Sequence, residues 1–205
     1  MEEVTAFAEL NQLSDAELVN RLKHMLLTHS ILRGEFTLKS GATSTWFIDA
    51  KATACRPEGI QLIALLTLRR LPSAVTAIGG QTMGADPIAF GVAAIGAVLG
   101  RPLRSFSIRK EVKDHGGGGR VAGALLKGDR VAIVEDASTR GTSIMAAVEA
   151  AREAGAEVVF ATSVVDRGGS AEAYLEAFGI PYVPLLRATD LDLPFEGGLP
   201  GYIRP

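Results

Sequence analysis

The chain has 205 residues, of which 47% are hydrophobic and 21% are charged, values ordinary for a globular protein with a substantial core. The formal net charge of −2 excludes the strongly basic character typical of nonspecific nucleic-acid binding. The single cysteine, Cys55, excludes a disulfide within this sequence and favours a reducing compartment. We expect Cys55 to be a small buried hydrophobic residue.

Two further features bear on where the protein works. The sequence begins with the acidic segment Met-Glu-Glu-Val, which is unlike a signal or transit peptide. Its longest uncharged apolar stretch, residues 87–100, is too short and too rich in glycine to span a bilayer. We therefore expect a cytoplasmic protein that binds neither a membrane nor nucleic acid.

The first predicted element is a helix. It follows a capping box, Ser14-Asp-Ala-Glu17, and its leucines recur at helical spacing. Two short strands around a glycine turn are expected next, at residues 36–41 and 44–49. Pro57 suits the first turn of the following helix, which should end near Arg70.

From residue 74 onward, predicted strands alternate with predicted helices. The strands are expected at residues 74–79, 104–109, 130–134, 157–165 and 182–186, and the helices at residues 87–99, 144–152 and 170–178. The alternation predicts an α/β fold with an open, mainly parallel sheet flanked by helices and with binding sites at the carboxyl ends of the strands. We expect a single domain, residues 1–205, with its core at about 70–187 and an irregular tail at 188–205.

A glycine-rich segment at residues 110–119 should not form a packed element. Four consecutive glycines carry a large entropic cost of ordering, so we expect this loop to move when no ligand is bound. The segment is also cationic. It is either a hairpin tip in solvent or a lid over phosphate groups.

Residues 130–152 give the strongest indication of a binding site. A buried strand ends in the carboxylates Glu135 and Asp136, and a turn of small and hydroxyl residues leads into a helix. Unpaired backbone N–H groups and the positive end of the helix dipole would face one point there, which favours an anion. Gly141 would let the backbone approach a phosphate closely.

The two acids do not suit a phosphate, but they suit ribose hydroxyls or a divalent metal beside it. Together with the anion site, they indicate a sugar phosphate as ligand. The alternative is an ordinary strand–loop–helix unit whose acids only cap the helix.

Four stretches give the chain a specific resemblance to a known family. They are Phe36-Thr-Leu-Lys-Ser-Gly41, Ile108-Arg-Lys-Glu-Val-Lys-Asp-His-Gly116, the loop from Glu135 to Ser143, and Val165-Asp-Arg167. In this order they resemble the orotate phosphoribosyltransferases of the type I phosphoribosyltransferase group. The resemblance implies that group's fold, with a small N-terminal hood at about residues 1–50. It also implies transfer of phosphoribose from phosphoribosyl pyrophosphate (PRPP) to orotate with Mg²⁺, and a homodimer that shares loop 110–119 between subunits.

The resemblance also implies roles for individual residues. The residues implied to bind orotate are Lys39, Phe47, Ile48, Thr139 and Arg167. Those implied to bind PRPP are Arg109, Lys110, Lys113, His115, Glu135, Asp136, Ala137, Ser138, Thr139, Arg140, Gly141, Thr142 and Ser143. The catalytic roles are implied for Lys113, His115, Glu135 and Asp136. No protein ligand is assigned to the Mg²⁺, which PRPP itself is expected to hold.

The sequence departs from the family pattern at two places. The turn at residues 80–87 lacks the Tyr-Lys pair of some members, so its pyrophosphate contacts would come from backbone N–H groups, and Asp86 is not expected to bind phosphate. Arg140 stands where a small residue is usual. It either reaches a phosphate or faces solvent, and of the two we expect it to face solvent.

Two other functions remain open at this point. One is a PRPP-sensing regulatory protein of the same fold, which would need a basic surface or an added DNA-binding element. The other is a phosphoribosyltransferase for another base, such as a purine. Lys39 and Arg167 argue against a purine, because it carries no carboxylate to pair with them.

Overall fold

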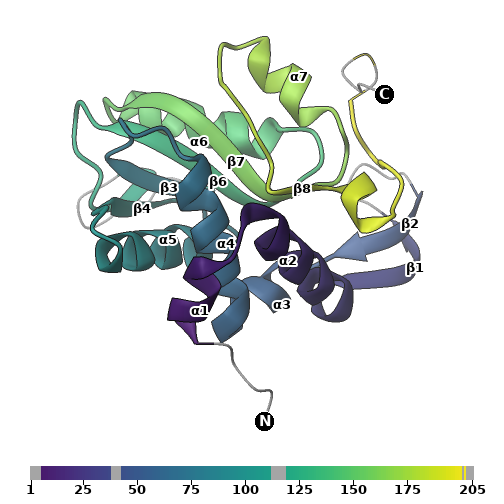
Figure 1. Cartoon of the computed structure of the whole chain (residues 1–205). Helices are drawn as coiled ribbons and strands as arrows, with labels where there is room; N and C mark the ends of the chain where they lie inside the picture. Colours follow the sequence, from purple (N-terminus) through teal and green to yellow (C-terminus); the bar gives the residue numbers. More distant parts are fainter. Residues whose placement is uncertain (1–5, 38–42, 112–118, 200, 202–205) are drawn as a thin grey trace.

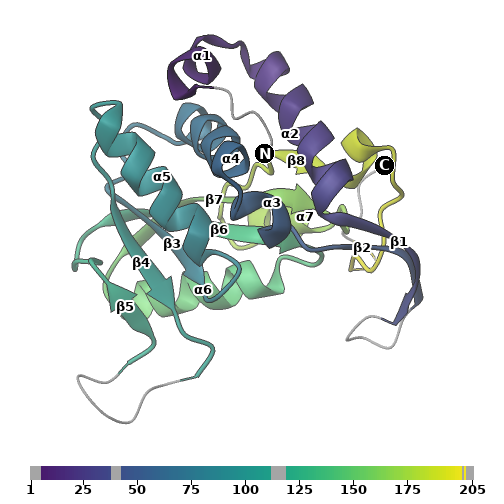
Figure 2. The same ribbon diagram turned by 90° about the horizontal axis from the view of Figure 1, so that it is seen from below.

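The computed structural model describes residues 6–37, 43–111, 119–199 and 201. Six strands form the central sheet in the order β5-β4-β3-β6-β7-β8, and β5 alone is antiparallel to its neighbour. Figure 1 labels the strands from β4 to β8 in this order, and Figure 2 also labels β5. Their bounds are Ala77–Gln81 (β3), Arg104–Ile108 (β4), Val121–Gly123 (β5), Arg130–Ser138 (β6), Glu157–Asp166 (β7) and Leu186–Arg187 (β8). The predicted α/β fold with a mainly parallel sheet is confirmed.

Helices cover both faces of this sheet, as Figure 2 shows. On one face lie α1 (Phe7–Gln12), α2 (Asp15–His29), α3 (Lys51–Ala54), α4 (Pro57–Arg70) and α5 (Asp86–Val98); on the other lie α6 (Thr142–Glu153) and α7 (Ala171–Glu176). The two faces carry separate hydrophobic cores. Among the described residues, no helix is both long enough and apolar enough to cross a membrane.

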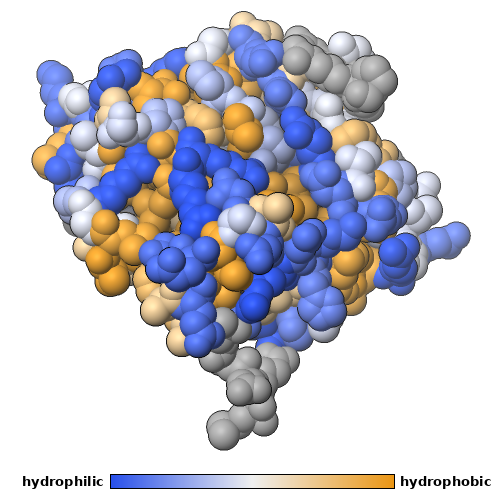
Figure 3. Space-filling view, viewed as in Figure 1, coloured by the Kyte–Doolittle hydropathy of each residue, from blue (hydrophilic) through white to orange (hydrophobic). Residues whose placement is uncertain are grey.

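The N-terminal helix α2 forms for the reasons that the sequence predicts. The Ser14 side chain accepts a hydrogen bond from the Glu17 backbone, and the Glu17 carboxylate accepts one from the Ser14 backbone at 2.8 Å. Its inward side buries Leu18, Leu22 and Leu26. The space-filling view of this side of the molecule shows hydrophilic residues interspersed with smaller hydrophobic patches (Figure 3).

A two-stranded antiparallel sheet follows α2 and forms the hood over the carboxyl ends of the central strands. It consists of β1 (Ile31–Thr37) and β2 (Thr43–Ile48), in which alternate residues are buried and exposed along β2. Trp46 is therefore buried, while its neighbour Phe47 is 41% exposed. The first strand starts five residues earlier than predicted.

Several other elements differ from the sequence prediction. The strand predicted to end before the two acids continues through them to Ser138, because β6 pairs with β7 as far as Asp166. The short elements α3 and β5 were not predicted. Cys55 is exposed, so its prediction as a buried residue is wrong: it lies at the end of α3, after the residues that face the core.

The segment after β8 is more ordered than an irregular tail. It contains a 3-10 helix, η1 (Ala188–Leu191), and buries Leu191 and Leu193 in the core that α2 and α4 share. The segment then runs past the hood, and its later residues reach the ends of β6 and β7.

Candidate active site

The candidate site lies where the chain order in the sheet reverses. The connection after β3 leads to β4 on one side, while β6 lies on the other side of β3. Parallel sheets have a crevice at the carboxyl ends of strands at such a switch point. A pocket of about 900 Å³ opens there, lined by Leu32, Phe36, Thr37, Phe47, Ile48, Glu135, Asp136, Ala137, Ser138, Thr139, Arg140, Gly141, Thr142, Ser143, Arg167 and Gly197.

One end of the pocket is built to receive a phosphate. Gly141 precedes α6 with φ of 80°, a conformation that favours glycine, and turns the chain so that the first N–H groups of the helix are available. Thr142 and Ser143 add hydroxyl groups there. Backbone donors, hydroxyls and the helix dipole thus converge at this end of the pocket.

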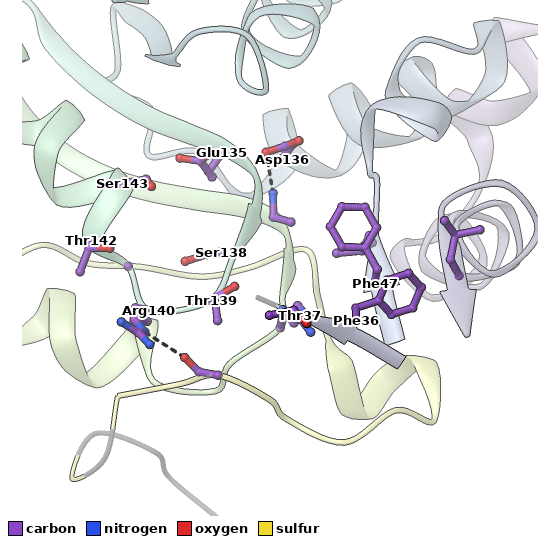
Figure 4. Close-up of a pocket in the computed structure, with 16 residues that line it drawn as sticks. Phe36, Thr37, Phe47, Glu135, Asp136, Ser138, Thr139, Arg140, Thr142 and Ser143 are labelled. Atoms are coloured by element: carbon purple, nitrogen blue, oxygen red, sulfur yellow. Dashed lines mark hydrogen bonds between the residues drawn. The ribbon is translucent and has the colours of Figure 1, made fainter. Parts of the chain in front are cut away.

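Arg140 lies in the wall of this pocket, so the expectation that it faces solvent is wrong. Its Nε donates a hydrogen bond to the Gly197 carbonyl at 3.1 Å (Figure 4). The C-terminal segment supplies this acceptor from 57 residues further along the chain, and the sequence gives no sign of the contact. The guanidinium therefore stands beside the phosphate end as a fixed cation.

Asp136 is held by a lysine that the sequence analysis missed. The Lys51 ammonium lies 3.1 Å from the Asp136 carboxylate and 2.8 Å from that of Asp49. The Ala137 backbone N–H also donates to Asp136, at 3.0 Å. A Cβ on Gly84 would lie 2.5 Å from the Asp136 carboxylate, so the turn after β3 approaches this closely only because residue 84 is glycine.

Glu135 has a different environment from its neighbour. Burial and the adjacent Asp136 carboxylate raise the pKa of Glu135 to about 8. Its Oε2 is buried and has no hydrogen-bond partner among the described residues. At neutral pH the pair therefore presents one negative charge rather than two, together with an unsatisfied oxygen that a sugar hydroxyl would satisfy.

The opposite end of the pocket combines aromatic and apolar side chains with one buried cation. The rings of Phe36 and Phe47 lie 5.7 Å apart, and Figure 4 shows them across the pocket from Arg140 and Thr142. Ile48 adds apolar surface. Planar rings and a cation at one end suit a flat, negatively charged ring.

Arg167 supplies that cation. Its side chain is only 6% exposed, and its guanidinium lies 4.8 Å from the centre of the Trp46 ring. One amino group donates to the Ser44 hydroxyl at 2.5 Å and to the Trp46 carbonyl at 2.9 Å. The Arg167 Nε is buried without a partner in the part of the chain that the structure describes. Burial lowers the pKa of Arg167, although arginine remains charged at neutral pH.

Close contact between two loops places Arg167 beside the phosphate loop. The Arg167 N–H donates to the Ser138 carbonyl at 2.7 Å. A Cβ on Gly168 would lie 1.8 Å from the Thr139 carbonyl oxygen, so only glycine lets the loops meet in this way. Thr139 therefore lies between the predicted base and phosphate ends.

The predicted residues of the cationic loop are only partly described. Arg109 donates a hydrogen bond to the Gly119 carbonyl at 3.4 Å, and Lys110 is exposed. Neither residue lines the pocket. The positive charge of Lys110 nevertheless opposes the rise in the pKa of Glu135. Lys39, Lys113 and His115 lie outside the described residues. Asp86, which is not expected to bind phosphate, accepts hydrogen bonds from the hydroxyls of Thr82 and Ser107.

The chemistry of the site is compatible with a Mg²⁺ ion that is held mainly by a phosphorylated ligand. Within the described residues, no three histidine, cysteine, aspartate or glutamate side chains cluster as a metal site. Mg²⁺ commonly uses one or two carboxylates, several waters and phosphate oxygens from the substrate. At the pocket wall Asp136 offers a carboxylate, and Glu135 would offer a second one on losing its proton.

Two acids at the end of β6, followed by a phosphate loop at the carboxyl ends of this sheet, are the arrangement of a type I phosphoribosyltransferase. No protein-family model matches the chain. The orotate phosphoribosyltransferase of Corynebacterium glutamicum (ATCC 13032) is 40% identical over 186 residues, which cover 90% of this chain and 97% of that protein. The enzyme of Bradyrhizobium diazoefficiens is 41% identical over 175 residues, 83% of this chain and 94% of that protein.

Solved structures agree with these relatives. The crystal structure of Mycobacterium tuberculosis H37Rv orotate phosphoribosyltransferase in complex with PRPP superposes with a TM-score of 0.68 at 33% identity, covering 87% of this chain and 99% of that one. The chain belongs to the orotate phosphoribosyltransferase family, and it is an enzyme of the glycosyltransferase type.

Proposed function

We propose that the pocket binds PRPP and orotate side by side and transfers the 5-phosphoribosyl group to orotate, giving orotidine 5′-monophosphate and pyrophosphate. The phosphate loop, Gly141 to Ser143, receives the 5′-phosphate, and Glu135 and Asp136 receive the ribose hydroxyls. The base occupies the space between Phe47 and Arg167. The observation that carries this proposal is the buried, partly unpartnered Arg167 guanidinium beside the phosphate loop, because an anionic base supplies the acceptor that it lacks.

In the reaction, orotate N1 donates its electron pair to C1′ as the C1′–O bond of PRPP breaks, and pyrophosphate leaves with that electron pair. Positive charge develops on the ribose, and negative charge develops on the leaving group. Asp136, held by Lys51, faces the ribose with a fixed negative charge. Bound Mg²⁺ would supply electrostatic stabilisation to the pyrophosphate. No covalent protein nucleophile is needed.

We also propose that Lys39 contacts orotate, and that Arg109, Lys110, Lys113 and His115 cover the pyrophosphate. Their cationic character supports this role. We propose in addition a homodimer in which loop 110–119 of one subunit completes the site of the other. A cytoplasmic location is proposed on the basis of the single cysteine.

Replacement of Arg167 tests the base site. Arg167→Ala should lower kcat/KM for orotate, since a charge-assisted contact is lost. The fall should correspond to a loss of roughly 2–4 kcal/mol in transition-state binding free energy. Arg187→Ala is the matched control, because Arg187 pairs with Glu172 at 2.7 Å and does not line the pocket. The measurement is steady-state kinetics with orotate varied at saturating PRPP. Equal kcat/KM in the wild type and Arg167→Ala would contradict the assignment.

A further inference from the structure

The C-terminal segment returns to the base end of the pocket through one carboxylate, that of Glu196. The Ser44 hydroxyl donates to it, and the Thr45 hydroxyl donates at 2.6 Å. The Thr45 backbone N–H donates at 3.2 Å, and an Arg167 amino group lies 3.4 Å away. Glu196 therefore gathers donors from the hood strand β2 and from the loop after β7.

The backbone of the same segment is fastened at the same place. The Glu196 N–H donates to the Arg167 carbonyl at 3.1 Å. The Trp46 indole N–H donates to the Pro194 carbonyl at 3.2 Å. The position of the Glu196 carboxylate is thus fixed from both sides rather than left to a freely moving tail.

These contacts hold one side of the Arg167 guanidinium. The Ser44 hydroxyl has a single hydrogen, and the charged carboxylate of Glu196 is its stronger acceptor. With that hydrogen directed to Glu196, a lone pair of Ser44 accepts from Arg167 at 2.5 Å. The Trp46 ring packs against the guanidinium face. The Nε is left without a partner among the described residues, and Arg167 lines the pocket.

We propose that Glu196 is a positioning residue for orotate: it fixes Arg167, directly and through Ser44, in the orientation that binds the anionic base. This inference rests on the proposed contact between Arg167 and orotate. Glu196 also supplies a negative charge beside a buried cation, which offsets part of the cost of keeping that cation out of water.

The geometry argues against the opposite role, in which Glu196 competes with the base. The segment contributes Gly197 to the pocket wall, whereas Glu196 does not line the pocket. Burial opposes ionisation of Glu196, but the hydrogen bonds from Ser44 and Thr45 outweigh it and lower its pKa, so the carboxylate remains charged. A competitor would have to leave these donors whenever substrate binds.

The test compares Glu196→Gln and Glu196→Ala with the full-length wild-type enzyme, with orotate and PRPP varied separately. Asp190→Asn is the matched control. It removes the same charge from the same C-terminal segment and weakens a 2.7 Å contact to the Arg187 backbone, and neither residue lines the pocket. Circular dichroism and the melting temperature establish that each variant folds.

Glu196→Ala should raise the KM for orotate about tenfold and leave the KM for PRPP and kcat within about twofold. Glu196→Gln, which keeps an acceptor oxygen, should restore part of the affinity, and Asp190→Asn should match the wild type. If Glu196→Ala does not fold, Thr45→Val removes one donor from the carboxylate and should raise the same KM by a smaller factor.

Three results would overturn the inference. The first is an unchanged KM for orotate in Glu196→Ala. The second is a lowered KM for orotate, which is the result expected if Glu196 competes with the base. The third is an equal rise in the KM values for orotate and PRPP. Failure of the proposed function looks different, because the wild-type enzyme itself would then not consume orotate.

Discussion

Glu135 and Asp136 are adjacent in one strand, but they differ in charge. Asp136 pairs with Lys51, whereas burial and the Asp136 charge raise the pKa of Glu135 to about 8. A protonated Glu135 can donate a hydrogen bond as well as accept one. It also adds no negative charge against a ligand as anionic as PRPP.

This difference predicts a pH-dependent stability. The ordinary pKa of a glutamate is about 4.5, so folded Glu135 keeps a proton that the unfolded chain loses between pH 4.5 and about 8. Its unfavourable contribution to folding therefore grows through this window and is complete above it. At pH 8.5 the free energy of unfolding of Glu135→Gln should exceed that of the wild type by roughly 2–4 kcal/mol. This gain in stability should shrink toward pH 4.5.

Urea denaturation at several pH values measures the effect. Asp129→Asn is a control of opposite sign. Burial acts to raise the pKa of Asp129, but hydrogen bonds from Leu126 and Thr76 and the charge of Arg104 outweigh burial and lower it. Removal of this carboxylate should therefore destabilise the protein at neutral pH. A gain for Glu135→Gln that does not change between pH 4.5 and 8.5 would show that Glu135 titrates normally.

Contacts between residues far apart in the sequence could not be predicted. The acids and Gly141 stand within a few positions of each other, so their local spacing indicated a sugar-phosphate site. Lys51 and Asp136 are separated by 85 residues, and Ser44 and Glu196 by 152. No local pattern indicates such pairs, because the fold alone brings them together. Arg140 was placed wrongly for the same reason.

At the scale of elements, hydrophobic periodicity and capping predicted the long helices well. The helix α4 has its predicted bounds, and α2 has its predicted capping box. The strand β6 is longer than predicted, because pairing with β7 continues past the apolar run to residues whose polarity indicated a turn. The last strand was predicted at residues 182–186, but β8 spans only Leu186–Arg187, and an isolated bridge pairs Tyr182 with Ala161 of β7.

The loop between β4 and β5 is the element for which we propose a role in a second subunit. If loop 110–119 crosses between the subunits of a twofold dimer, two inactive variants should complement each other. We predict that mixing Lys113→Ala with Asp136→Asn recovers roughly a quarter of wild-type activity, because about half of the dimers are mixed and each has one intact site.

Subunit exchange is verified with two differently tagged chains, and each variant mixed with itself gives the background. A mixture in which exchange is verified but activity stays at that background would show that the loop serves its own subunit.

On the scale of the whole molecule, segments from four parts of the chain enclose the pocket. The hood contributes Phe36 and Phe47, and the central strand–loop–helix contributes the acids and the phosphate loop. The loop after β7 contributes Arg167, and the C-terminal segment contributes Gly197. The α/β core was predictable from the alternation of its strands and helices. The part played by the C-terminal segment was not, because its proline and glycine content is typical of an irregular tail.

Above all, this pocket should join orotate to the phosphoribosyl group of PRPP. The most direct measurement follows consumption of each base when the enzyme is incubated with PRPP, Mg²⁺ and orotate, uracil, adenine or hypoxanthine in turn. We predict that orotate is consumed with stoichiometric release of pyrophosphate and that the other three bases, which lack a carboxylate, are not. Efficient turnover of hypoxanthine or adenine without turnover of orotate would contradict the claim.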